Sequence, residues 1–328
     1  MKRLGIFLMA VFMVSPLVGQ QVNSKINPNV KVDLKALHDL NAKVHLSPDI
    51  DLDFDHDIDI DLDHEGDFES HDGNWDATDY IQDEQEIEIP LSSPGERGVL
   101  KVESHNGSVI INGYGGQTVK VKMIKYIKKV DKDKTKDGMR LVSSGGFNVE
   151  AEEYNNTVKV ENDGWNNRVD FIIQVPKNFD IKAETYNNGE LVVTDVEGEV
   201  DVENYNGPIK LEGISGVASA STYNGSIVVV FTKITPDKPM EFNTYNGKID
   251  LTVPATSKFT AKMKTSKEIY TDFENLTMQQ SEPEKKSGDG GRGYSIKYEN
   301  WIQGKLNGGG ADVSMETRNG DIYIRKGN

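Results

Sequence analysis

The chain has 328 residues, a formal net charge of −16 and no cysteine. The absence of cysteine excludes disulfides, thiol catalysis and cysteine metal sites. A mean hydropathy of −0.55 and 31 glycines indicate many turns around a modest core, and the length suits one large domain or two small ones.

Residues 1–20 are typical of a secretory signal peptide. Lys2 and Arg3 form the positive start, Leu4–Val14 is an apolar run, and small and polar residues follow as far as Gln20. The run is shorter than the ~20 apolar residues that a membrane-spanning helix needs, and no later segment looks long and apolar enough for one. We therefore predict an exported protein without a transmembrane span, which is periplasmic, secreted or held at the cell surface.

Residues 21–84 are expected to form an acidic and largely irregular extension. Without Lys2 and Arg3 the net charge is −18, and the stretch Asp49–Glu88, with 18 acidic residues and no lysine or arginine, accounts for all of it. Inside it, aspartate occupies every odd position from 49 to 63, and nearly every even position is apolar. Because side chains alternate along a strand, an extended chain would place eight carboxylates on one face: Asp49, Asp51, Asp53, Asp55, Asp57, Asp59, Asp61 and Asp63.

Two interpretations of this Asp-rich segment stay open. Calcium takes about six to eight oxygen ligands and suits carboxylates. Same-face residues of a strand lie about 7 Å apart, so the chain would have to bend before neighbours could share one ion. The segment is therefore either a weak, multi-ion calcium site or a solvated acidic spacer or edge strand. Apart from calcium, no cofactor is expected.

From residue 85 to residue 328 the sequence repeats a strand–turn–strand motif. Its tag is Asn-Gly, the strongest short turn signal, because both residues tolerate positive φ. The positions two and four before the tag, and three and five after it, recur in character, so seven copies would share one inward face. The tag asparagines are Asn106, Asn155, Asn187, Asn206, Asn224, Asn246 and Asn319, with Asn155-Asn156 and Asn187-Asn188-Gly189 as variants.

The spacing of the copies distinguishes two all-β architectures. Asn206 and Asn224 are 18 residues apart, and Asn224 and Asn246 are 22 residues apart. One motif in every ~20 residues favours a β-solenoid or β-roll of about seven repeats, in which each coil stacks on the last. A β-sandwich is the alternative, because it also has turns every ~8–12 residues. Insertions interrupt the repeats at about 128–140 and 278–293.

Several stretches of the repeat region resemble the β-strand-repeat adhesin family of bacteria, which is also described as a domain of unknown function. They are Val175-Pro176-Lys177-Asn178-Phe179 with the turn that follows, a second copy from Val253-Pro254, and the ending Gly304–Ile324. The resemblance covers about residues 95–328. It implies a right-handed β-solenoid in an exported protein of the cell envelope, and it supplies no catalytic residues.

A tyrosine immediately precedes the turn asparagine in five copies. Coils about 4.8 Å apart would line these rings along one outer edge, with His105 and Arg318 at the same position in the outer copies. Exposed aromatic rings beside amides suit a sugar or peptide ligand, and self-stacking that fixes the register is the alternative. The tyrosines are Tyr154, Tyr186, Tyr205, Tyr223 and Tyr245.

Charge separation points to contacts within the chain rather than to nucleic acid. The stretch Lys120–Arg140 carries nine basic and three acidic residues, but the acidic remainder and the export signal argue against a nucleic-acid partner. Docking of the acidic segment onto this stretch is the interpretation that we favour.

Catalysis has little support in the sequence. Five of the six histidines lie before residue 72, and no nucleophile-elbow, zinc-protease or phosphate-loop motif occurs. A polysaccharide-active β-helix enzyme is the alternative, but the acidic residues of Asp195–Glu203 largely alternate with valines, as on a solvated strand face. The sequence thus predicts a non-catalytic, adhesin-like binding or structural module with an envelope glycan or surface protein as its partner, and leaves the oligomeric state open.

Overall fold

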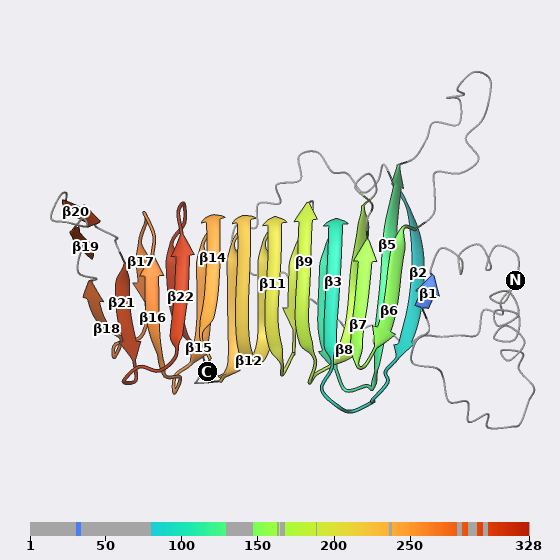
Figure 1. Ribbon diagram of the computed structural model, residues 1–328, viewed down its shortest axis with the longest axis horizontal. Helices are drawn as coiled ribbons and strands as arrows, with labels where there is room; N and C mark the ends of the chain where they lie inside the picture. Colours follow the sequence, from blue (N-terminus) through green and yellow to red (C-terminus); the bar gives the residue numbers. More distant parts are fainter. Residues whose placement is uncertain are drawn as a thin grey trace, which may run out of the picture.

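The computed structural model describes an all-β chain (Figure 1). It covers residues 31–33, 80–128, 147–162, 164, 168–187, 189–235, 238–280, 284–287, 294–297 and 301–327. Within these ranges no helix is long and apolar enough to cross a membrane. The predicted signal peptide and the Asp-rich segment 49–63 lie outside the described residues. The all-β prediction is confirmed.

Twenty-one strands form one hydrogen-bonded network, which consists of two ladders that share the long strand β12 (Ile209–Asn224). The first ladder runs in the order β1 (Lys31–Asp33), β6 (Val149–Tyr154), β7 (Thr157–Asn162), β3 (Val99–Asn106), β9 (Asp180–Asn187), β11 (Glu199–Asn206), the end of β12, β14 (Met240–Asn246), β22 (Asp312–Thr317), β16 (Phe259–Lys264), β21 (Ile302–Leu306) and β18 (Thr277–Gln280).

The second ladder runs in the order β2 (Tyr80–Pro90), β5 (Thr118–Lys128), β8 (Val169–Pro176), β4 (Val109–Tyr114), β10 (Leu191–Thr194), the start of β12, β13 (Ile227–Ile234), β15 (Ile249–Pro254), β23 (Ile322–Gly327) and β17 (Ile269–Thr271). A separate hairpin joins β19 (Glu284–Ser287) to β20 (Tyr294–Lys297).

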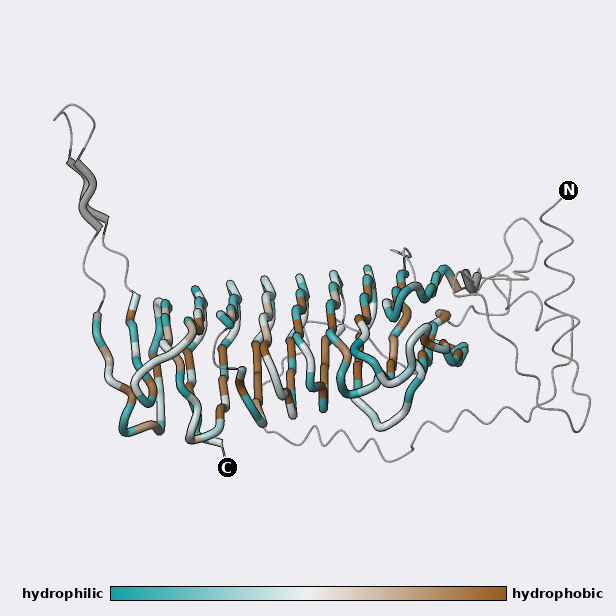
Figure 2. The backbone as a smooth tube through the Cα atoms, turned by 60° about the horizontal axis from the view of Figure 1, so that its bottom comes forward, coloured by the Kyte–Doolittle hydropathy of each residue, from teal (hydrophilic) through white to brown (hydrophobic). Residues whose placement is uncertain are grey.

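Most copies of the motif cross from one ladder to the other at the Asn-Gly turn. The strand before the turn pairs in parallel with its counterparts in the first ladder, and the strand after it does so in the second. Equivalent motif positions are in register, as Val202 is with Ala183 and Ala220. Apolar and polar residues alternate along the strands (Figure 2), and the apolar ones form a shared core.

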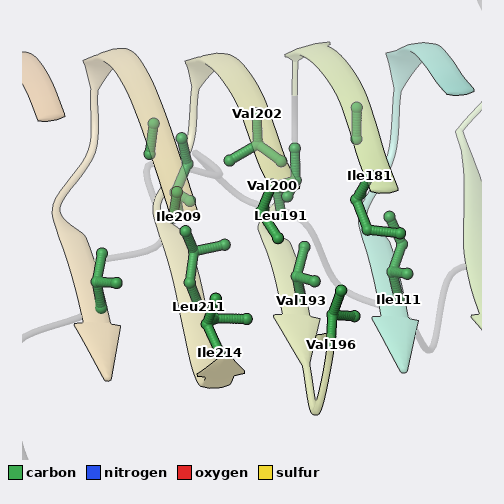
Figure 3. Close-up of a cluster of buried hydrophobic side chains, with 14 of the residues drawn as sticks. Ile111, Ile181, Leu191, Val193, Val196, Val200, Val202, Ile209, Leu211 and Ile214 are labelled. Carbon is green, nitrogen blue, oxygen red and sulfur yellow. The ribbon is translucent and has the colours of Figure 1, made fainter. Parts of the chain in front are cut away.

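The core consists mainly of β-branched and leucine side chains from successive copies. Leu191, Ile209 and Leu211 are fully buried and lie among the equivalent residues of neighbouring strands (Figure 3). Burial of one such side chain on folding stabilises the folded state by roughly 1.5–3 kcal/mol. The same apolar positions are thus repeated from one copy of the motif to the next, which holds the register.

The Asn155-Asn156 copy has a different structure from the other copies. Its strands β6 and β7 form an antiparallel hairpin inside the first ladder, with Tyr154 opposite Thr157. Asn155 and Asn156 have φ values of 50° and 58°, as two-residue hairpin turns require. This copy keeps the predicted inward face, since Ala151, Val158 and Val160 are buried, but two consecutive positive φ values fold it back within the first ladder, so it does not cross to the second.

The end of the second ladder is a pair of strands of opposite charge. The acidic strand β2 pairs along its whole length with the basic strand β5, from Tyr80 opposite Lys128 to Pro90 opposite Thr118. Lys122 Nζ lies 2.9 Å from a carboxylate oxygen of Glu84 and 3.6 Å from one of Glu86. Opposite charges across a strand pair are favourable, so this part of the acidic stretch does dock on the basic one.

Candidate ligand groove

Strand alternation places the turn tyrosines on the outer face of the first ladder. In β11, Val200, Val202 and Asn204 are buried, whereas Glu203 and Tyr205 are exposed. The same alternation occurs in β9 and in the end of β12. Parallel, in-register pairing then brings equivalent outer residues together from strand to strand.

Four of the five predicted tyrosines form a continuous stack. The ring centroids are 4.8 Å apart for Tyr186 and Tyr205, 5.3 Å for Tyr205 and Tyr223, and 4.9 Å for Tyr223 and Tyr245. The ring planes differ by only 5°, 7° and 13°. The guanidinium of Arg318 lies 5.3 Å from the Tyr245 centroid, so a cation covers the last ring of this tyrosine stack.

The structure does not bring Tyr154 to the stack. Tyr154 ends β6, which pairs in antiparallel fashion with β7 and β1, and its side chain is 58% exposed. The position beside Tyr186 belongs instead to His105, since Ser104 and Asn106 of β3 pair with Thr185 and Asn187 of β9.

A groove of about 1110 Å³ runs across seven strands along this stack. Three consecutive residues at or just after the end of each strand line the groove, and they end at the residue before the turn asparagine or at the equivalent position. The seven lining triplets are Glu103–His105, Glu184–Tyr186, Glu203–Tyr205, Ser221–Tyr223, Asn243–Tyr245, Glu316–Arg318 and Lys264–Ser266. The middle residue of every triplet is serine, threonine or asparagine, and the third is tyrosine in four of the seven, so the lining repeats in part along the groove.

The stacking of the rings decides what the tyrosines can offer to a ligand. Because each inner ring faces a tyrosine on both sides, its two faces are covered, and its edge and hydroxyl remain free to make contacts. Tyr186, Tyr205 and Tyr223 are 42–44% exposed in this edge-on arrangement. The stack thus offers a row of hydroxyl groups and ring edges, not a flat aromatic platform for a sugar face.

A row of carboxylates lies beside the tyrosine edges at one end of the groove. Glu103, Glu184 and Glu203 occupy equivalent positions on neighbouring strands and are exposed. Like charges directly opposite each other on paired strands are unfavourable, so a ligand that donates hydrogen bonds to them would relieve a repulsion. Sequence analysis missed this row, although the recurrence of glutamate three residues before the turn asparagine could have indicated it.

The floor of the groove rests on a hydrogen-bonded column under the turns. Thr222 Oγ1 donates to the Gly207 carbonyl at 3.0 Å, and Thr244 and Thr317 donate to Gly225 and Gly247 at 2.8 Å. Each threonine thus ties its own strand to the turn that follows the neighbouring strand. These contacts fix the spacing of the groove residues from one strand to the next.

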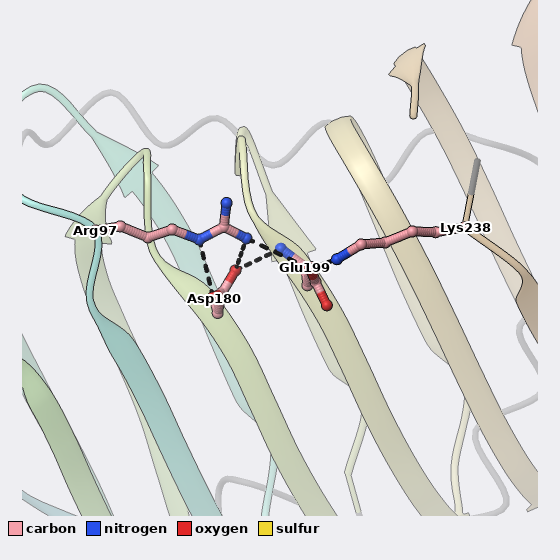
Figure 4. Close-up of polar contacts among 4 residues, drawn as sticks. All are labelled: Arg97, Asp180, Glu199 and Lys238. Atoms are coloured by element: carbon pink, nitrogen blue, oxygen red, sulfur yellow. Dashed lines mark hydrogen bonds and ion pairs between the residues drawn. The ribbon is translucent and has the colours of Figure 1, made fainter. Parts of the chain in front are cut away.

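An exposed ionic network links neighbouring strands of the first ladder near the residues at which these strands begin (Figure 4). Arg97 Nε donates to Asp180 Oδ2 at 2.9 Å, and the backbone N–H of Glu199 donates to Asp180 Oδ1 at 2.7 Å. Lys238 also contacts the Glu199 carboxylate. Because these side chains are largely exposed, the network adds little to stability, but it leaves Glu199 engaged and outside the groove.

The predicted calcium residues, Asp49 to Asp63 at odd positions, lie outside the described residues. In the described ranges, no group of three or more histidine, aspartate or glutamate side chains is placed to hold a metal ion. The groove is a candidate ligand site in the described part of the chain.

The sequence matches no protein-family profile and no curated protein. Among solved structures, the chain is similar to a protein from Clostridium sporogenes described as a putative cell adhesion protein. The identity is 13% and the TM-score 0.37, over 75% of this chain and 100% of that one.

Proposed function

We propose that this protein is an exported, non-catalytic, adhesin-like module that binds an extended envelope glycan in the groove of the first ladder. The observation that supports this most is the row of four tyrosines and of seven serine, threonine or asparagine residues at equivalent positions of the seven lining triplets. A polymer made of repeating units can make the same contact again at each strand, so weak individual contacts add up.

The chemistry of the lining favours a polyhydroxylated chain. Glutamate carboxylates accept hydrogen bonds from hydroxyl groups, and tyrosine hydroxyls both donate and accept them. The row of Glu103, Glu184 and Glu203 would repel a phosphate backbone, which argues against nucleic acid. We further propose that the two ladders form a right-handed β-solenoid, with the groove running along its axis.

The test is affinity electrophoresis of the full-length protein in native gels that contain soluble linear polysaccharides of neutral, anionic and cationic type. We expect one class to retard the wild-type protein. The double variant Tyr205→Phe with Tyr223→Phe keeps the stacked rings but removes two hydroxyls, and Glu203→Gln removes one carboxylate. Each should reduce the retardation with an unchanged melting temperature.

Tyr154→Phe is the matched control, because Tyr154 is exposed but lies outside the stack. It should bind like the wild-type protein. Retardation by none of the polysaccharides, or retardation that the groove variants leave unchanged, would contradict a groove that binds glycans.

A further inference from the structure

The last two strands of the chain lie out of sequence order. Strand β22 lies between β14 and β16 in the first ladder, and β23 lies between β15 and β17 in the second. Yet β14–β15 and β16–β17 follow each other in the sequence, separated only by residues 255–258. Residues 312–327, here called the C-terminal unit, therefore fill a slot between two units that adjoin in the sequence (Figure 1).

The C-terminal unit is bound on both sides of this slot. Met315 pairs with Phe242 on one side and with Met263 on the other, and Ile322 pairs with Ile249 and Ile269. Met315 and Ile322 are fully buried. The slot thus recognises the unit through two parallel pairings in each ladder and through its apolar side chains.

Polar contacts add to this recognition at specific residues. Asn319 Nδ2 donates to Asn246 Oδ1 at 2.7 Å, and Arg325 Nε donates to Asp250 Oδ1 at 2.6 Å. On the other side, Lys264 Nζ lies 2.8 Å from a carboxylate oxygen of Glu316. These contacts require only that the unit is present, and not that it comes from the same chain.

A short glycine-rich tether connects the unit to the rest of the molecule. Strand β21 ends at Leu306, and the unit begins at Asp312. Between them lie Asn307 and Gly308–Gly310, with positive φ at Asn307 (49°), Gly308 (93°) and Gly309 (86°). Glycine adopts many backbone conformations at little steric cost, so this tether can act as a hinge.

During synthesis the slot lacks its occupant at one stage. The residues that fill it are made after all the strands that border it, and until they arrive the facing edges of β14 and β16 lack this partner. An unpaired strand edge is a template for a strand from another chain. Any other molecule of this protein carries the same C-terminal unit, which fits the slot in both ladders.

We propose that the C-terminal unit is an exchangeable unit, which can fill the slot of a second copy of this chain. The tether of residues 307–311 spans at most about 17 Å when extended, so the slots of the two partners must face each other closely. Exchange is then reciprocal and gives a closed, two-fold dimer, in which each copy makes the same contacts as within one chain.

The test uses the natural absence of cysteine. Glu241 and Ser314 are register partners of β14 and β22. We would unfold and refold together a full-length Glu241→Cys variant and a full-length, size-tagged Ser314→Cys variant, and then oxidise them. The control pair, Lys182→Cys with Asp201→Cys, replaces register partners of β9 and β11, which lie in the middle of the first ladder and have no such tether. A single chain with both Glu241→Cys and Ser314→Cys checks the register itself.

We expect the Glu241→Cys and Ser314→Cys mixture to give several-fold more disulfide-linked heterodimer than the control pair, rising with protein concentration. The single chain with both cysteines should form an internal disulfide, since neighbouring strands bring Cα atoms within reach of one. Heterodimer no more abundant than in the control pair would overturn the exchange. Failure of the internal disulfide would overturn the register on which the proposal rests.

Discussion

The side-chain amide of Asn224 donates to Oδ1 of Asn206 at 2.8 Å and accepts, through its own Oδ1, from Asn246 at 2.7 Å. Asn206 donates in turn to Asn187 at 2.8 Å, and Asn319 donates to Asn246 at 2.7 Å. The turn asparagines therefore form an amide ladder along the stack. Their repetition in the sequence serves this ladder, and not only the turn.

Replacement of Asn224 by alanine should destabilise the protein by about 1–3 kcal/mol, because it breaks two ladder bonds in a part-buried site: Asn206 Oδ1 loses its donor and Asn246 Nδ2 loses its acceptor. The measurement is the midpoint of urea unfolding. The matched control is Asn319→Ala at the exposed end of the ladder, where only one ladder bond is lost. Equal effects of the two substitutions would argue against a ladder that stabilises its interior.

Replacement of Gly225 by alanine should cost about 1–3 kcal/mol through overpacking. A Cβ at this position would lie 2.1 Å from the carbonyl oxygen of Gly207 in the preceding turn, which is backbone and cannot easily move. Gly115→Ala is the control, since a Cβ there meets nothing within 4 Å. Thermal unfolding of both variants checks the prediction, and a Gly225→Ala variant as stable as Gly115→Ala would refute it.

The turn residues show which parts of the fold could be predicted from the sequence. The Asn-Gly pairs predicted turns, and turns are present. For the variant pair Asn155 and Asn156 the local turn rule is a sufficient explanation, since both residues have positive φ. At Gly225 the requirement is the close approach of the next turn. A local turn rule cannot reveal this, because the contact joins residues of different copies of the motif.

The candidate site was predictable to a similar extent. The tyrosine stack from Tyr186 to Tyr245 followed from the repeat, since parallel pairing of the copies puts equivalent residues in register. The exclusion of Tyr154 did not follow, because it depends on a hairpin that pairs within one ladder. The out-of-order position of β22 and β23 was also not predictable, since pairing partners distant in sequence leave no local signal.

Replacement of Tyr205 by serine should lower stability by about 1–3 kcal/mol, because it removes two ring contacts, each worth about 0.5–1.5 kcal/mol. Tyr205→Phe keeps both contacts and should be nearly neutral. Tyr154→Ser, outside the stack, should change stability by less than about 0.5 kcal/mol. Urea unfolding of the three variants distinguishes a stabilising stack from rings that merely lie close together.

Replacement of Glu190 by glutamine should stabilise the protein more at neutral pH than at acid pH. Burial raises the pKa of Glu190 above its ordinary value of 4.5, against the opposing effect of Lys210. A carboxyl whose pKa is raised by folding favours the folded state below its unfolded pKa, and this contribution is lost as the pH rises through the folded pKa. The stability advantage of Glu190→Gln should therefore grow from about pH 4 towards pH 7. The exposed substitution Glu241→Gln is the control, and a pH-independent difference for Glu190→Gln would contradict the argument.

The amide ladder should also decide which Asn-Gly pair deamidates. In this reaction the backbone nitrogen of the glycine attacks the asparagine Cγ, ammonia leaves, and water opens the ring to aspartate or isoaspartate. The amide of Asn224 is held by both of its ladder neighbours, and the backbone N–H of Gly225 donates to the Asn246 carbonyl at 2.9 Å. Asn319 is exposed, and it has one ladder neighbour among the described residues.

We therefore expect Asn319 to deamidate well before Asn206, Asn224 and Asn246 when the folded protein is incubated at alkaline pH, as followed by peptide mass spectrometry. In urea all four pairs should react at similar rates, because their local sequences share Asn-Gly and the ladder is gone. Reaction of Asn224 as fast as Asn319 in the folded protein would mean that the ladder does not hold the amides firmly enough to block the attack.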